Sequence, residues 1–216
     1  MKEAVNVYWK KRLADLKNNL EENNFDVFIA ESAAEAKEII LNSILPQLQF
    51  KTVSWGGSMT FGATGIADIF KTGAITVINP YEPNISPEEA YERRRQALLV
   101  DLYFTGTNAI TEDGHLVNLD MTGNRVGALN FGPKHVIVLI GRNKIVAGLE
   151  EAMMRIKNFA SPTNAMRLDK KTPCTTTSVC KDCKSPERIC NVWTVTEKSY
   201  PKKRIKVVLI NQDLGL

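Results

Sequence analysis

The chain has 216 residues and a mass of 24.1 kDa, which fits one large domain with at most a small appendage. Hydrophobic residues make up 44% and charged residues 24%, so a disordered or fibrous chain is excluded. No apolar run approaches the ~18 residues that a membrane span needs. The N-terminal segment is charged throughout and lacks the apolar core of a signal peptide, so we expect a cytoplasmic protein.

The net charge of +4 is unevenly distributed along the chain. Residues 165–206 hold eleven Lys and Arg against four Asp and Glu, a local balance of +7, so the remainder carries −3. Only Trp193 and Tyr200 supply aromatic rings in this basic segment, which argues against nucleic-acid binding. We interpret the basic residues as a balance for the negative charge of nearby thiolates.

The first predicted element is an amphipathic helix over 3–23, whose polar face mixes both signs and favours a structural brace over a membrane anchor. Short apolar strands and capped helices then alternate. Strands are predicted at 25–30, 51–55, 74–79, 101–106 and 134–141, and helices at 32–45, 86–98 and 146–159. This alternation predicts an α/β fold with a Rossmann-like layered, mostly parallel sheet and helices on both faces.

The C-terminal part of the sequence follows a different pattern. After Ser161 the alternation fails until two apolar runs at 193–198 and 204–210, which we expect to form a pair of edge strands. We therefore divide the chain into an α/β body at 1–162 and a cysteine-rich tail with edge strands at 163–216, both parts of the same domain.

Ligands in such sheets bind at the carboxyl ends of the strands, so the strand-to-helix turns are the first candidates for a site. The turn SWGGSMTFGATG at 54–65 places Gly56 and Gly57 before Ser58 at a predicted helix N-terminus, an arrangement that suits an anion. The pattern is neither a Walker loop nor a GxGxxG motif. A tight turn without a ligand is an alternative explanation of the same glycines.

A second segment, TGTNAITEDGHLVNLDMTGNRVGALNFGPK at 105–134, holds more short polar side chains than a connector needs, and Asp113-Gly114 is a hairpin signal. These polar side chains are Thr107, Asn108, Thr111, Glu112, Asn118, Asp120, Asn124 and Arg125. Glu112 is a candidate base or nucleophile, while a turn carboxylate that caps backbone amides explains it equally well.

The run FTGTNAITEDGHLVNLDMTGNRVGALNFGPKHVIVLIGRNKIV, together with WGGSMTFG, RRRQAL and the cysteine tail, resembles the LUD domain (DUF162) family of LutC/YkgG-like lactate-utilisation proteins over about residues 5–190. The resemblance implies a NagB/RpiA/CoA-transferase-like fold. In that group an early glycine/serine turn holds an anion, and a later glycine-rich turn often supplies an acidic residue for chemistry.

Carried over to this sequence, the resemblance implies an anion turn at Gly56, Gly57, Ser58 and Met59. Facing it we expect Thr107, Asn108, Glu112, Asp113, Asn118, Asn124 and Arg125, with Glu112 and Asp113 as the catalytic carboxylates. Arg125 is expected to meet the anion, so that its replacement by alanine weakens binding roughly 10- to 100-fold. One of Arg93, Arg94 and Arg95 is expected to turn toward the same pocket, since a guanidinium matches a carboxylate.

The family resemblance also implies partner subunits and a redox function. Lactate-utilisation proteins act with iron–sulfur partner subunits that oxidise lactate to pyruvate, which implies a small-carboxylate-binding subunit of an oxidoreductase complex. No flavin or nicotinamide motif is present. An independent transferase or isomerase of a phosphorylated or CoA-linked molecule, a non-catalytic scaffold, and a homodimer all stay open.

All four cysteines lie in PCTTTSVCKDCKSPERIC at 173–190. Cys180 and Cys183 form a C-x₂-C pair whose sulfurs can reach one metal, and Cys174 and Cys190 complete four ligands. A reducing compartment disfavours a disulfide staple. The spacing does not choose between zinc and an iron–sulfur cluster; the redox setting of the resembled family favours the cluster, with zinc as the alternative.

Overall fold

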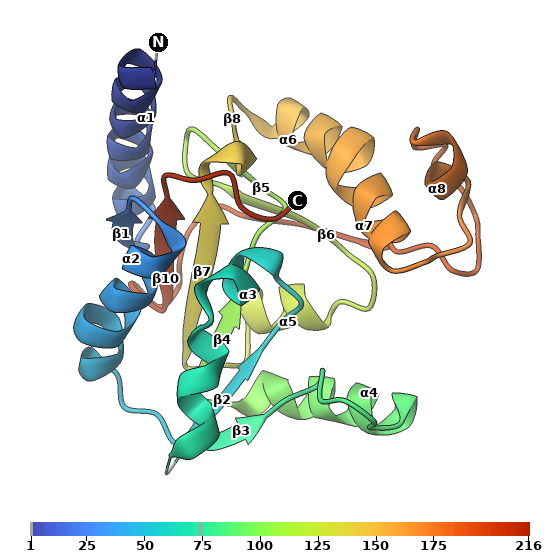
Figure 1. Cartoon of the computed structure of the whole chain (residues 1–216), viewed down its shortest axis with the longest axis horizontal. Coiled ribbons are helices and arrows are strands. Elements are labelled where there is room, and N and C mark those ends of the chain that lie inside the picture. The colour runs from blue at the N-terminus through green and yellow to red at the C-terminus, as the bar shows by residue number, and fades with distance from the viewer. Residues whose placement is uncertain (1, 74) are drawn as a thin grey trace.

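The computed structural model describes residues 2–73 and 75–216 (Figure 1). Strands are Asp26–Ala30 (β1), Thr52–Trp55 (β2), Thr76–Ile78 (β3), Leu102–Thr105 (β4), Ala109–Thr111 (β5), Leu116–Asp120 (β6), His135–Gly141 (β7), Ile145–Val146 (β8), Val192–Thr196 (β9) and Ile205–Ile210 (β10). Helices are Lys2–Glu22 (α1), Ala33–Ile39 (α2), Met59–Thr64 (α3), Pro87–Gln96 (α4), Asn124–Asn130 (α5), Leu149–Arg155 (α6), Ser161–Arg167 (α7) and Pro173–Thr177 (α8).

In this part of the chain, the central sheet has six strands in the order β1-β10-β7-β4-β2-β3, and each neighbouring pair is parallel. The predicted α/β fold with a mostly parallel sheet is confirmed. The five strands predicted before residue 142 are present, although position 74, the predicted start of the third, lies outside the described residues. The serine caps predicted at Ser32 and Ser86 are also present, since each hydroxyl accepts from a backbone N–H three residues later.

The prediction that 193–198 and 204–210 form an edge pair is wrong. β10 lies inside the central sheet, between β1 and β7, and all six of its residues are buried. From Val207 to Ile210 the run VVLI is apolar on both faces of the strand, which suits a central strand covered on both sides. β9 instead belongs to a second, smaller sheet of order β8-β5-β6-β9, where it pairs with β6.

The smaller sheet contains the predicted hairpin. β5 and β6 are antiparallel, with Ile110 opposite Leu116, and Gly114 has a φ of 87° in the connecting turn. A left-handed backbone is accessible to glycine without strain, which explains why Asp113-Gly114 forms the turn.

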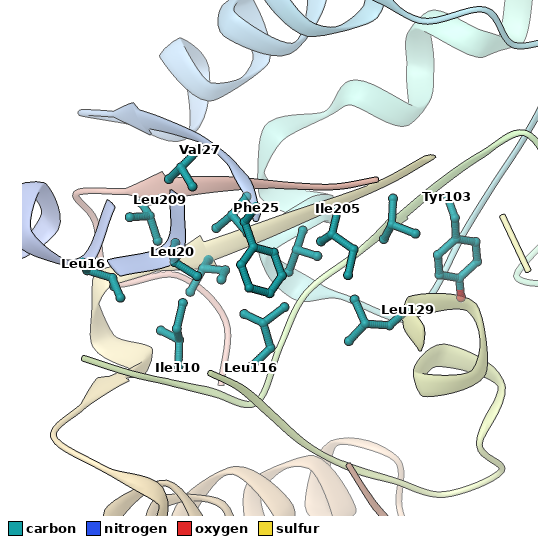
Figure 2. Close-up of a cluster of buried hydrophobic side chains, with 14 of the residues drawn as sticks. Leu16, Leu20, Phe25, Val27, Tyr103, Ile110, Leu116, Leu129, Ile205 and Leu209 are labelled. Atoms are coloured by element: carbon teal, nitrogen blue, oxygen red, sulfur yellow. The ribbon is translucent and has the colours of Figure 1, made fainter. Parts of the chain in front are cut away.

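Two hydrophobic clusters cover opposite faces of the central sheet. On one face α1 contributes Leu13, Leu16 and Leu20, and Figure 2 shows Leu16 and Leu20 near Phe25 and Leu209, with Ile110 and Leu116 of the smaller sheet beside them. On the other face, the buried side chains come from the segments of α2 and α3, as with Ala36, Ile40 and Phe61. The N-terminal helix is therefore a brace on the central sheet, as predicted.

A third cluster joins the smaller sheet to the helices that follow it. Ala152 of α6 and Ile156 pack on Ala109, Val117 and Leu119. This packing fixes α6, and the helix α7 that continues from it, on the side of the smaller sheet away from α1 (Figure 1). None of the helices among the described residues is both long enough and apolar enough to span a bilayer.

Asp101 stabilises the amino-terminal edge of the central sheet. Its carboxylate lies 2.7 Å from Lys134 Nζ and accepts the backbone N–H of Lys51 at 2.8 Å and of Thr52 at 3.1 Å. The hydrogen bond from Lys134, followed by that from the Lys51 backbone, holds the pKa of Asp101 well below its usual value.

We expect Asp101→Asn to lower the free energy of unfolding by about 1.5–3 kcal/mol at pH 7, because hydrogen bonds to a charged acceptor are lost. The folded-state pKa is depressed, so this contribution is present above the unfolded value of ~3.9 and is lost as the pH falls below it. Urea unfolding at several pH values checks this. Lys134→Ala is the control that removes only the exposed partner of the ion pair with Asp101, and it should lower the free energy of unfolding by about 1 kcal/mol or less. If the difference in the free energy of unfolding between the wild type and Asp101→Asn does not shrink at acid pH, the Asp101 carboxylate does not stabilise this edge of the sheet.

Candidate functional site

A pocket of about 480 Å³ lies at the carboxyl ends of the central strands, as expected for a parallel sheet. Its walls are the turn after β2, the turn after β4, the β6–α5 loop, and α7 with the residues that follow it. The predicted residues that line it are Gly57, Ser58, Met59, Thr107, Asn108, Asn124 and Arg125. Two turns that lie far apart in the sequence, near 57 and 107, therefore meet at one site.

Glycines allow these two turns to pack closely. A Cβ atom on Gly106 would lie 2.7 Å from Ser58 Oγ, and one on Gly56 would lie 2.8 Å from the Tyr103 hydroxyl oxygen. Gly56 thus lies behind the pocket wall and does not line it. Ser58 Oγ accepts from the backbone N–H of Phe61 at 3.1 Å, so its hydroxyl hydrogen is the group that it can offer to a ligand.

Arg125 is buried beneath the β6–α5 loop, with 8% of its surface exposed. Its guanidinium nitrogens lie within hydrogen-bonding or ion-pair distance of acceptors in the protein. The acceptors are Asp120 Oδ1 at 3.3 Å, Asn108 Oδ1 at 2.8 Å, Asn118 Oδ1 at 2.5 Å, Gly106 O at 3.2 Å and Leu119 O at 3.5 Å. Five N–H groups thus meet five acceptors, and Arg125 positions the loop more than it offers free donors to a ligand. Asn118 lies behind the wall as one of these acceptors.

Lys144 follows β7 and lines the same pocket with only 5% of its surface exposed. Its Nζ lies 3.2 Å from Thr60 Oγ1 and 3.1 Å from the carbonyl oxygen of Thr107, and both partners are uncharged. Burial, with added repulsion from Arg155 and Arg125, lowers the Lys144 pKa to about 7.

Further cations line the outer part of the pocket: Arg94, Arg167 and Lys170. Arg94 lies over the Tyr81 ring, with its guanidinium carbon 5.8 Å from the ring centroid. Its neighbours Arg93 and Arg95 pair with glutamates, whereas no carboxylate among the described residues pairs with Arg94. The expectation that one of these three arginines turns toward the pocket is therefore met by Arg94.

Glu112 and Asp113 do not lie at the pocket, contrary to the expectation that they face the anion turn. They form the tip of the β5–β6 hairpin, against α1. Glu112 forms an ion pair with Arg12, and its backbone carbonyl accepts from Asn19 Nδ2 at 2.7 Å. The Asp113 carbonyl accepts from Asn23 Nδ2 at 2.9 Å. The tip is at the opposite end of β6 from Asp120, so the whole length of that strand separates the two carboxylates from the pocket.

The four cysteines share a second, smaller pocket, of about 20 Å³, between α7, α8 and the loop that follows α8. All four thiols are free. The backbone N–H of Asp182 lies 3.5 Å from Cys180 Sγ, and the Thr172 hydroxyl lies 3.2 Å from Cys174 Sγ. Lys157, Lys181 and Arg188 line the same pocket.

This pocket supplies a donor set for a metal but not a finished metal site. Four thiols with basic residues around them suit a tetrathiolate centre in ligand number and charge. Within 2–73 and 75–216, however, no three His, Cys, Asp or Glu side chains are arranged to hold an ion. Binding would require the loop at 178–190 to draw the sulfurs together.

Ser161 and Ile189 line both pockets, so the cysteine pocket and the cationic pocket share a wall. Ser161 opens α7 and lines the cysteine pocket together with Cys190. Burial raises the pKa of the Cys190 thiol, and the nearby Ser161 hydroxyl opposes that rise. Any group held by the cysteines would therefore be adjacent to a ligand in the cationic pocket.

Fold and site together define an α/β protein with a cationic small-molecule pocket at the carboxyl edge of a parallel sheet. The LUD domain model matches residues 13–210, and the chain belongs to the LUD domain family. No curated protein matches the sequence.

A similar solved structure is the crystal structure of a DUF162 family protein from Deinococcus radiodurans, with a TM-score of 0.52 and 15% identity over 94% of this chain and 98% of that one. This likeness shows the fold. A D-ribose-5-phosphate isomerase in complex with phospho-erythronic acid has a TM-score of 0.34 and 17% identity over 53% of this chain and 55% of its own. The eIF2B delta subunit from Chaetomium thermophilum has a TM-score of 0.31 and 18% identity over 54% of this chain and 50% of its own.

Proposed function

We propose that this protein binds a small anionic metabolite, a carboxylate, in the cationic pocket and is the ligand-binding subunit of an iron–sulfur-dependent lactate-oxidation system. The observation that carries the proposal is the charge of the pocket. Five basic side chains line it, namely Arg94, Arg125, Lys144, Arg167 and Lys170, whereas Asp120 is the one acidic side chain among the described lining residues. Its volume of about 480 Å³ suits a small molecule.

Asp120 does not offset this excess of positive charge. It lies 3.3 Å from the Arg125 Nε and is therefore matched within the wall. Lys144, Arg94, Arg167 and Lys170 line the same pocket, and no carboxylate side chain among the described residues forms an ion pair with them, so the pocket attracts an anion.

The redox part of the proposal is supported by the shared wall of the two pockets. Cys174, Cys180, Cys183 and Cys190 would hold the metal centre, for which an iron–sulfur cluster is proposed ahead of zinc. When bound, a cluster supplies a one-electron acceptor, and iron–sulfur partner subunits would carry electrons onward. This role sets the chain in the reducing cytoplasm, where thiols stay unpaired.

Arg94→Ala should weaken the binding of the anion about 10- to 100-fold, since a charge-assisted contact contributes about 1.5–3 kcal/mol. Calorimetry and thermal-shift screens with lactate, pyruvate, sugar phosphates and CoA identify the ligand and measure the loss. Arg95→Ala is the matched control: it removes an adjacent arginine that pairs with Glu92 at 2.6 Å, and its affinity should equal that of the wild type.

Two outcomes would count against the pocket as the binding site. One is equal affinity of the Arg94→Ala and Arg95→Ala variants for every ligand found. The other is a screen in which none of the anions shifts the melting temperature of the wild type while neutral compounds do.

A further inference from the structure

Lys144 is the buried lysine of the cationic pocket. It lies on the segment that leaves β7, among α3, the turn after β4, and the C-terminal residues. A Cβ atom added to Gly215 would lie 3.2 Å from Lys144 Nζ, so the chain is packed closely around the amine. No carboxylate among the described residues forms an ion pair with Lys144, and an unpaired ammonium is costly to bury, so this lysine calls for a chemical explanation.

We propose that the Lys144 amine forms an imine with the carbonyl carbon of a small compound that also carries a carboxylate or phosphate group. This rests on the proposed function, because the pocket cations would hold the anionic group. The class of substrate is thereby narrowed to anionic carbonyl compounds, such as 2-oxo acids or phosphorylated aldehydes.

The hydrogen bonds around Lys144 suit a neutral amine. Thr60 Oγ1 lies 3.1 Å from the carbonyl oxygen of Leu214 and donates its hydrogen there, so toward Lys144 it acts as an acceptor. The Thr107 carbonyl is an acceptor as well. A neutral amine has two N–H groups and one lone pair, so these two bonds use both hydrogens and leave the lone pair for a carbonyl carbon.

The charges around Lys144 favour the same protonation state. Burial is the main cause that lowers the Lys144 pKa, and Arg155 of α6 and Arg125 of α5 add to it by repelling a positive charge at Nζ, which brings the pKa to about 7. Asp120, the carboxylate on the pocket wall, is paired with Arg125. A large fraction of the amine is therefore unprotonated at neutral pH, the condition for attack on a carbonyl.

The step balances without any further reagent. The nitrogen lone pair attacks the carbonyl carbon, the N–C bond forms, and the C–O bond breaks after the amine's two protons have moved to the oxygen. The products are an imine and one water molecule, and no electrons are gained or lost. The pocket opens to solvent on its Arg167 and Lys170 side, where water can leave.

Borohydride trapping tests the proposal. Wild-type protein is incubated with pyruvate, pyridoxal 5′-phosphate or acetone, reduced with borohydride, digested, and mapped by mass spectrometry. We expect one reduced adduct per chain, at Lys144, with the two anionic carbonyls, and at least about 10-fold less with neutral acetone. Excess lactate, an anion without a carbonyl group, should protect Lys144.

The chain supplies internal controls. Lys206 is also buried, and its pKa is also lowered by burial, but it lies in β10 outside the pocket and donates to the Lys203 carbonyl, so it should stay unmodified. Lys202→Met removes an exposed lysine outside the pocket and should keep the adduct at Lys144. Lys144→Met should form no adduct in the pocket. If that variant does not fold, the position of the adduct mapped in the wild type still tests the proposal.

Failure of this inference is distinguishable from failure of the proposed function. Anion binding measured by calorimetry with no adduct at Lys144 would overturn the imine and leave the anion site standing. An adduct that is spread over surface lysines, or that acetone forms equally well, would also overturn it. If no anion binds and no adduct forms, both proposals fail.

Discussion

Replacing Arg125 by alanine should lower the free energy of unfolding by about 3–5 kcal/mol, the range found when one partner of a buried ion pair is removed. The side chain meets acceptors from two segments, namely the turn after β4 and the strand β6, which ends at Asp120. Without it, Asp120 is left as an uncompensated, largely buried carboxylate, and the amide oxygens of Asn108 and Asn118 lose a charged donor. For a chain of this length the loss corresponds to a drop in Tm of roughly 6–20 °C.

Urea unfolding and thermal melts of the purified variants check this prediction. Arg125→Lys keeps the charge but not the planar arrangement of five donors, and it should recover only part of the stability. Arg94→Ala is the control on the same pocket, with stability near that of the wild type and weaker binding. Wild-type stability in Arg125→Ala would show that the network contributes nothing.

This expectation changes the role that the sequence suggested for Arg125. An arginine in a polar, glycine-bearing turn looks like a free anion ligand when nothing is known of its neighbours. The structure surrounds it with acceptors, and the pocket cations with spare donors are Arg94, Arg167 and Lys170. Weaker ligand binding in Arg125→Ala would then follow from a disordered loop and not from a lost contact.

The central sheet was predictable because its signals are local. Apolar runs of strand length and serine caps depend only on neighbours in the sequence, and each predicted strand up to residue 141 is present. The place of β10 was not predictable in this way, since its pairing with β1 and β7 joins residues more than sixty positions apart. The apolar run VVLI at 207–210 was the available signal for a central strand.

The candidate site was predictable where it depends on the carboxyl ends of strands. Ser58 and Thr107 follow β2 and β4, which pair directly, so their turns had to be neighbours. Glu112 was misplaced because a hairpin reverses the chain direction, which puts its tip at the end of β6 away from Asp120. Lys144 was missed because nothing in the sequence tells a buried lysine from an exposed one. Its position directly after the buried strand β7 was the signal that could have found it.

The largest all-or-none effect is expected at the cysteines. Protein purified under anaerobic conditions should be brown, absorb near ~400 nm, and contain iron and labile sulfide, since four thiolates are the ligand set of iron–sulfur clusters. Each single Cys→Ser substitution at 174, 180, 183 or 190 should lower the iron content sharply, because the chain has no fifth cysteine to replace a lost ligand.

Val179→Ser is the matched control: it places the same hydroxyl in the same loop, at an exposed position next to Cys180, and keeps all four thiols. A colourless protein with about one zinc per chain would reject the cluster and keep the tetrathiolate site. Unchanged metal content in all four cysteine variants would reject both, and the shared wall at Ser161 and Ile189 would then have no redox role.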